Sequence, residues 1–220
     1  MLYRGAVGVA GLVVNLEAVN GALLNSRIIE YPYVLERLHG QEPGRALDVG
    51  ATDTSNFLAP SLVAMGWEVW GIDVRPFALE LAGFHTVVDD IRATPFADGF
   101  FDVVYCVSTI EHVGLSGRYG VRVEDPDGDI TAACEIRRIV RAGGRFILTI
   151  PYGVGGIVKP PERIYDRARL DRLTEGWETV HRRFHHLDEE GRWHEVDEAE
   201  AARARTPGGV TVALMELHRV

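Results

Sequence analysis

From residue 45 onward, short apolar runs alternate with segments of helical periodicity, and no other feature of the sequence constrains the fold as strongly. The apolar runs have a composition that favours strands; they cover residues 45–50, 67–74, 85–90, 101–109 and 145–151. Helical patterns, each ending in glycine, lie between them; they cover residues 54–66, 76–83 and 129–144. Strands that alternate with helices pair in parallel and carry the helices on both faces of the sheet. The sequence therefore predicts an α/β fold.

The last third of the chain changes character. We expect a helix over residues 163–176, a strand over 177–186 and a final strand over 208–220. The polar stretch 187–205 predicts a surface loop or a short helix. No internal repeat or linker interrupts the sequence, so we expect one domain over residues 41–220, preceded by a helical extension over residues 1–40.

The N-terminus contains an apolar stretch, Gly5–Val14, that resembles a weak signal-peptide core. Polar residues interrupt it at Asn15, Glu17 and Asn20, before the length of about 20 residues that a membrane span requires. We therefore expect a packed or amphipathic helix there and no stable membrane insertion.

Charge and cysteine content exclude other classes. The formal net charge is −9 with no basic cluster, which argues against a nucleic acid partner because phosphate contacts dominate such binding. The two cysteines, Cys106 and Cys134, cannot form a disulfide framework and lack metal-ligand spacing, which fits a cytoplasmic protein. The histidines of the tail, with no accompanying carboxylate pattern, do not predict a metal site either.

Acidic residues follow several of the predicted strands. Ligands of open parallel sheets bind beyond the carboxyl ends of the strands, and Gly50 allows the backbone to turn close to a ligand there. Asp73, at the end of its strand, is placed to accept hydrogen bonds from both ribose hydroxyls of a nucleoside. Asp90, or its neighbour Asp89, is placed to meet an adenine amino group. The structural alternative for Asp73 is that it caps the following helix. The alternative for Asp89 and Asp90 is that they are solvated loop residues.

Glu111 and His112 follow the strand at residues 101–109. The unperturbed pKa of histidine lies near neutrality, so His112 could act as a general base on an acceptor hydroxyl. Glu111 could orient His112 or hold the amino group of a cofactor. The alternative is that His112 caps the next turn.

As a whole, this pattern resembles the class I S-adenosylmethionine-dependent methyltransferases over about residues 45–153. ALDVGATDTSNF is similar to the first cofactor motif of that family, and VWGIDV to its ribose-binding motif. VVDDIRATPFADGFFDVVYCVSTIEHV and EIRRIVRAGGRFILTIPYG are similar to the motifs that follow. The resemblance implies a Rossmann-like, doubly wound sheet of seven mostly parallel strands with a reversed C-terminal strand and helices on both faces. It also implies that residues 41–220 form the methyltransferase domain, while the preceding helix lids the cofactor.

The resemblance implies S-adenosyl-L-methionine as the cofactor. Asp48, Gly50 and Ala51 should line its methionine moiety, Asp73 its ribose, and Asp90 with Ile91 its adenine. Their neighbours complete the expected cofactor site: Thr52, Val74 and Ser108. One departure from the family pattern is the glycine-poor first loop, in which Thr52, Asp53 and Thr54 stand where glycines are expected.

The acceptor is less well defined. The segments SRIIEYPYVLERL, HVGLSGRYG and RIYDRARLDRLTEGWE are similar to a methyltransferase-like subgroup associated with glycan genes. We therefore expect methyl transfer to a small-molecule or glycan-type acceptor, and a homodimer is compatible with the sequence. The polar candidates facing the acceptor are Arg118, Tyr119 and Tyr152.

Two other functions share the sheet. A nicotinamide-dependent oxidoreductase or epimerase would have a glycine-rich first turn and a Tyr-x-x-x-Lys pair, and this sequence has neither. A non-catalytic nucleoside-binding module is compatible with the glycine-poor loop and stays open.

Overall fold

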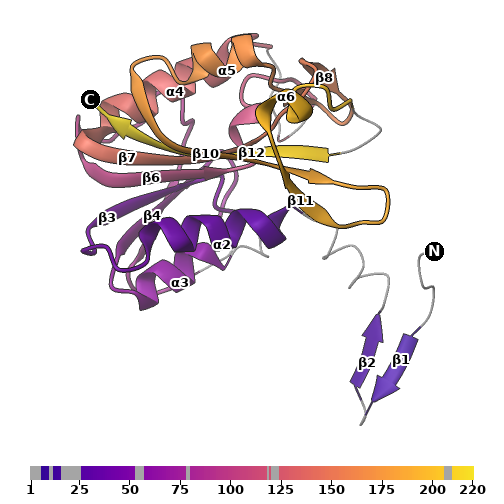
Figure 1. Cartoon of the computed structure of the whole chain (residues 1–220). Helices are drawn as coiled ribbons and strands as arrows, with labels where there is room; N and C mark the ends of the chain where they lie inside the picture. The colour runs from indigo at the N-terminus through magenta and orange to yellow at the C-terminus, as the bar shows by residue number, and fades with distance from the viewer. Residues whose placement is uncertain are drawn as a thin grey trace.

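The computed structural model describes residues 6–9, 12–15, 26–52, 57–77, 80–117, 119, 124–205 and 210–220. An eight-stranded sheet runs through the described part of the chain (Figure 1). In spatial order its strands are β11 (Trp193–Val196), β10 (Trp177–Leu187), β12 (Val210–Arg219), β7 (Val140–Pro151), β6 (Phe101–Val107), β3 (Arg45–Val49), β4 (Glu68–Asp73) and β5 (Phe84–Val88).

The strands from β5 to β7 pair in parallel. β12 runs antiparallel to β7 and to β10, and β11 antiparallel to β10. The chain first builds outward from β3 to β4 and β5, then returns to β6 on the other side of β3. This confirms the doubly wound α/β sheet with a reversed C-terminal strand, and it places the reversal of strand order between β3 and β6.

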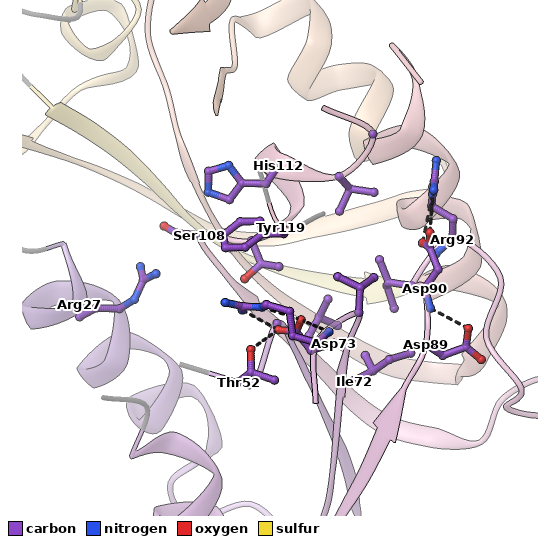
Figure 2. Close-up of a pocket in the computed structure, with 18 residues that line it drawn as sticks. Arg27, Thr52, Ile72, Asp73, Asp89, Asp90, Arg92, Ser108, His112 and Tyr119 are labelled. Carbon is purple, nitrogen blue, oxygen red and sulfur yellow. Dashed lines mark hydrogen bonds and ion pairs between the residues drawn. The ribbon is translucent and has the colours of Figure 1, made fainter. Parts of the chain in front are cut away.

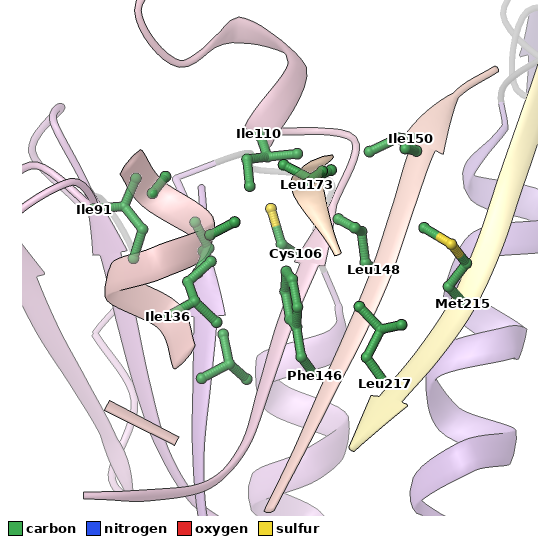
Figure 3. Close-up of a cluster of buried hydrophobic side chains, with 14 of the residues drawn as sticks. Ile91, Cys106, Ile110, Ile136, Phe146, Leu148, Ile150, Leu173, Met215 and Leu217 are labelled. Atoms are coloured by element: carbon green, nitrogen blue, oxygen red, sulfur yellow. The ribbon is translucent and has the colours of Figure 1, made fainter. Parts of the chain in front are cut away.

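Helices cover both faces of the sheet. α2 (Arg27–Leu38) and α3 (Leu58–Ala64) lie on one face, and α4 (Gly128–Ile139) and α5 (Arg167–Leu173) on the other (Figure 1). Each layer has its own buried apolar cluster. Ile136 and Leu173 pack on the α4–α5 side against Cys106, Phe146 and other sheet residues, as Figure 3 shows.

The sheet has one strand more than the seven expected. The stretch 187–205 contains a short helix, α6 (Glu198–Ala201), which was one of the two alternatives expected there, and the strand β11, which was not expected. β11 pairs with β10 in a register that sets Trp193 opposite Leu187. Trp193 and Val196 are half-buried on this strand, and the two residues between them are exposed. The strand therefore lacks the strict apolar–polar alternation by which a half-buried strand is recognised in a sequence.

Three predicted helices differ from the structure. The described residues of 76–83 are not helical; Phe77 packs edge-on against Phe84 instead. α4 ends at Ile139, because Val140 already pairs with Phe101 in the sheet. α5 begins at Arg167, because a hairpin of β8 (Gly156–Val158) and β9 (Glu162–Ile164) occupies the preceding residues.

The N-terminal extension is helical only in part. α2 is a helix, as expected, but Ala6–Val9 and Leu12–Asn15 form a two-stranded antiparallel hairpin, β1 and β2, where a helix was predicted. Valine is abundant in both strands, and its β-branched side chain favours strand over helix. No helix within the described residues is long and apolar enough to cross a bilayer.

Candidate active site

A cavity of about 340 Å³ opens at the carboxyl ends of β3, β4, β5 and β6, where the strand order reverses (Figure 2). Its walls come from the loops after these strands and from the start of α2. The lining residues are Arg27, Val49, Gly50, Thr52, Ile72, Asp73, Val74, Arg75, Asp89, Asp90, Ile91, Arg92, Ser108, Thr109, His112, Val113, Gly114 and Tyr119. The structure thus brings eight of the eleven predicted site residues to one cavity.

The first turn of the cavity requires glycine at position 50. Gly50 has a φ of 85°, and its amide donates to the Ile72 carbonyl at 2.8 Å. A Cβ atom at this position would lie 2.3 Å from Thr109 Oγ1. The Thr109 side chain packs directly against Gly50, so any other residue would collide with it, and both this contact and the positive φ require glycine.

Asp73 is a buried carboxylate at the end of β4. It accepts hydrogen bonds from Thr52 Oγ1 at 2.7 Å, from Arg75 Nη2 at 2.8 Å and from the Arg75 backbone amide at 2.9 Å. Burial acts to raise the pKa of Asp73, but the hydrogen bonds from Arg75 and Thr52 outweigh it and lower that pKa. Asp73 is therefore an anion at neutral pH, fixed in orientation before any ligand arrives.

Arg75 occupies the oxygens of Asp73 that ribose hydroxyls would use, and its guanidinium lies 4.5 Å from the Tyr119 ring centroid. A nucleoside must displace part of this contact. Because Arg75 is 41% exposed, the ion pair contributes only about 0–1 kcal/mol. Arg75→Ala is therefore expected to tighten nucleoside binding about 2- to 5-fold.

Calorimetric titration of S-adenosylhomocysteine into both forms measures this effect. Arg167→Ala, which removes an exposed arginine from an ion pair with Glu198 instead, is the matched control and should leave the affinity unchanged. Weaker binding by Arg75→Ala would show that Arg75 assists the ligand rather than competing with it.

Asp89 and Asp90 both line the far end of the cavity (Figure 2). Arg92 binds the Asp90 carboxylate through Nη2 at 2.7 Å and through its backbone amide at 2.9 Å. Burial acts to raise the pKa of Asp90, and the hydrogen bonds from Arg92 more than offset it, so the pKa is lowered. Asp89 Oδ1 accepts the Asp90 amide at 2.8 Å. Both acids stay candidates for the adenine contact.

Three predicted residues do not line the cavity. Asp48 and Ala51 are buried on the α2–α3 side of the sheet, where Asp48 lies beside the Tyr105 phenol. Glu111 is also buried, and burial raises its pKa well above the usual range. Their contacts with a ligand stay a prediction.

α2 closes one end of the cavity through Arg27. Glu30, which is fully buried, forms an ion pair with Arg27 and accepts hydrogen bonds from the Ser108 hydroxyl and from Thr149 Oγ1, the latter at 2.7 Å. This carboxylate ties the helix to the ends of β6 and β7. α2 is thus fixed against the cavity in this structure.

His112 belongs to a short 3-10 turn, η1 (Ile110–His112), that follows β6. Its Nδ1 lies 3.0 Å from the Pro161 carbonyl oxygen, and its Nε2 lies 3.8 Å from Glu111 Oε1. The ring packs edge-on against Tyr119, 5.5 Å between centroids, and Figure 2 shows both side chains on the same side of the cavity. His112 is therefore placed to contact a ligand, while Glu111 lies too far to hydrogen-bond with it.

Other candidates lie elsewhere. Tyr152 is buried away from the cavity, 3.2 Å from Glu198, whereas Tyr119 lines it. Arg118 lies outside the described residues. Three of the tail histidines have hydrogen-bond partners, which are Tyr33 for His181, Thr211 for His186 and Asp188 for His194. No group of metal-ligand side chains occurs in the described parts of the chain.

The sequence reasoning missed the cavity's arginines, although a signal was present. Asp73-Val74-Arg75 and Asp90-Ile91-Arg92 repeat the same Asp-x-Arg pattern after consecutive strands. In both, the arginine amide and guanidinium bind the carboxylate two residues earlier.

Comparison with known proteins identifies relatives of the chain and proteins of the same fold. Among curated proteins, the chain is 31% identical over 127 residues to a ubiquinone biosynthesis O-methyltransferase of Alkalilimnicola ehrlichii, a match covering 53% of this chain and 45% of that protein. The chain thus matches less than half the length of this relative.

Solved structures with the same fold include an S-adenosylmethionine-dependent methyltransferase of Methanosarcina mazei, 14% identical, with a TM-score of 0.59 over 84% of this chain and 97% of that one. A second is the 1,6-didemethyltoxoflavin-N1-methyltransferase of Burkholderia thailandensis, whose structure contains 1,6-didemethyltoxoflavin and S-adenosylhomocysteine. It is 15% identical, with a TM-score of 0.60 over 98% of this chain and 95% of that one. The fold is therefore that of the class I methyltransferases.

The chain also matches a protein family over the segment that runs from just before β5 to the loop after α6. Residues 82–205 match the family described as Caenorhabditis protein of unknown function, DUF268. Because this match covers more than half of the sequence, the chain belongs to the DUF268 family.

Proposed function

We propose that this chain is an S-adenosylmethionine-dependent methyltransferase that acts on a hydroxyl group of a small-molecule or glycan-type acceptor. The observation that carries the proposal is the set of acids and the glycine turn that four strand ends bring to one cavity. The relatives named above are methyltransferases, which supports the same reading.

The residues present fit the cofactor. Gly50 lines the cavity and has no side chain, so a ligand can approach its backbone there. Asp73, ionised and buried, suits the two hydroxyls of a ribose, and Asp90 or Asp89 with Ile91 suits an adenine edge. Thr52, Val74 and Ser108 line the same cavity.

When bound, S-adenosylmethionine supplies a methyl group that its sulfonium already activates, so the protein mainly aligns the acceptor. His112 and Tyr119 form the wall on which we place the acceptor. Nε2 of His112 takes the proton of the acceptor hydroxyl as the oxygen is methylated. Arg27, at the other end, favours an anionic group of a ligand.

Calorimetric titration with S-adenosylmethionine, S-adenosylhomocysteine and NADH tests the proposal. We expect the first two to bind and NADH not to bind. Binding of NADH alone would instead support the oxidoreductase, and binding of none would contradict both.

Acceptor classes are then screened by S-adenosylhomocysteine release, with phenols, sugars and amines in separate arms. Release with hydroxyl compounds alone supports the proposed chemistry. Release with amines alone would reassign the reaction to N-methylation. We also propose that the protein is cytoplasmic and forms a homodimer. Light scattering in solution measures the oligomeric state.

A further inference from the structure

The β8–β9 hairpin lies outside the main sheet and contacts the turn that bears His112. Its connecting loop places the Pro161 carbonyl oxygen 3.0 Å from His112 Nδ1. A carbonyl oxygen can only accept a hydrogen bond, so Nδ1 must be the donor. In the neutral ring the single proton is then on Nδ1, and Nε2 carries the lone pair.

A buried arginine of the same hairpin, Arg163, binds the backbone of the turn that contains His112. Arg163 is 3% exposed, and its guanidinium donates to four backbone carbonyls. Two of them flank His112, at Glu111 (3.4 Å) and Val113 (2.5 Å). The other two precede α4, at Asp125 (3.2 Å) and Pro126 (3.3 Å).

The charge of Arg163 is balanced by Asp129, a fully buried residue in the first turn of α4. Asp129 Oδ1 lies 3.8 Å from Arg163 Nε. The Asp129 carboxylate also accepts from Arg169 Nη2 at 2.6 Å and from the Tyr165 hydroxyl at 2.9 Å. A buried charge is tolerated only with such partners. Arg163 is therefore part of a buried, charge-paired network that supports the His112 turn.

We propose that Pro161 and Arg163 are positioning groups that fix His112 in its Nδ1–H tautomer, in which Nε2 carries the lone pair. The Pro161 carbonyl accepts a hydrogen bond from Nδ1–H and so keeps the ring proton on Nδ1. Arg163 fixes the backbone on both sides of the histidine. The use of this tautomer for methyl transfer rests on the proposed function, whereas the tautomer itself does not.

The tautomer decides what His112 can do. With the proton on Nδ1, Nε2 can accept a proton from a hydroxyl. With the proton on Nε2, the same atom would present an N–H and could not act as a base. An unconstrained histidine side chain in water favours the Nε2–H form, so the hairpin must impose the other one.

Long-range ¹H–¹⁵N spectra of histidine-labelled protein, recorded where the His112 ring is neutral, measure the tautomer directly. His112→Asn, which removes one set of signals, assigns the resonances. We expect the Nδ1–H pattern for His112 in the wild-type chain. An Nε2–H pattern would overturn the proposal, even if S-adenosylmethionine binds and methyl transfer is seen.

Arg163→Lys tests the positioning residue, because one ammonium group cannot reach four carbonyls. We expect a mixture of tautomers, a fall in kcat of about 10-fold and unchanged affinity for S-adenosylhomocysteine. Arg169→Lys is the matched control: it also perturbs Asp129 but does not contact the η1 carbonyls, so His112 should keep its tautomer.

An unchanged His112 spectrum and kcat in Arg163→Lys would remove Arg163 from the proposal. If Arg163→Lys does not fold, the wild-type spectrum alone decides the tautomer. If no methyl transfer is found with any acceptor but the Nδ1–H pattern is seen, the proposed function fails and the tautomer assignment stands.

Discussion

Asp73→Ala is expected to weaken the binding of S-adenosylmethionine by about 100-fold or more. In the proposed complex the Asp73 carboxylate accepts two charge-assisted hydrogen bonds from ribose, each worth about 1.5–3 kcal/mol, and every 1.4 kcal/mol corresponds to about a factor of ten. The contact with Arg75 that is given up on binding offsets about 0–1 kcal/mol of this sum, so about 30-fold is the lower limit and 100-fold or more is the expectation. Calorimetric titration measures the change in Kd.

Asp98→Ala is the matched control, because Asp98 pairs with Arg138 on the surface and does not line the cavity. Affinity equal to wild type in Asp73→Ala would contradict the ribose assignment.

The pH dependence of the affinity gives a second check of this assignment. Since the pKa of Asp73 is lowered, the carboxylate loses its charge only as the pH falls through that lowered value. Affinity that depends on Asp73 should therefore be retained from neutral pH down to about pH 5.

His112→Asn is expected to lower kcat by about 100- to 10,000-fold, the range typical of a lost general base. The asparagine amide can still donate to the Pro161 carbonyl, so the turn keeps its contact while the Nε2 base is removed. Because His112 is not expected to hold the cofactor, the Kd for S-adenosylhomocysteine should change little. S-adenosylhomocysteine release at saturating cofactor measures the effect.

His194→Gln serves as the control histidine, since His194 lies on β11 at the opposite edge of the sheet, where its ring is bound to Asp188. A His112→Asn protein with wild-type kcat would show that the reaction needs no base at this position. A protein with unchanged kcat but poor cofactor affinity would reassign His112 to binding.

Local sequence patterns predicted the parallel part of the fold well. The apolar runs at β3, β4, β6 and β7 are nearly continuous because these strands are buried on both faces, and their short length and flanking glycines or prolines indicate strand rather than helix. The order of the acids along the chain then predicted the cavity, since parallel strands bring their carboxyl ends to one edge.

Tertiary contacts decided the rest. β11 is a four-residue strand at the edge, and its pairing with β10 is not visible in its own composition. The residues at 76–83 pack through Phe77 instead of forming a helix. Arg163 reaches the His112 turn across about fifty positions of the chain, so nothing near Glu111 or His112 in the sequence points to it.

The Asp-x-Arg pairs after β4 and β5 have a consequence for the ligand-free protein. Asp73 and Asp90 each already have a guanidinium from their own loop as counterion. A nucleoside that enters exchanges one partner for another instead of neutralising an isolated anion. The apoprotein should therefore remain folded during purification and storage with no nucleotide added, and its Tm should rise on ligand addition through mass action alone.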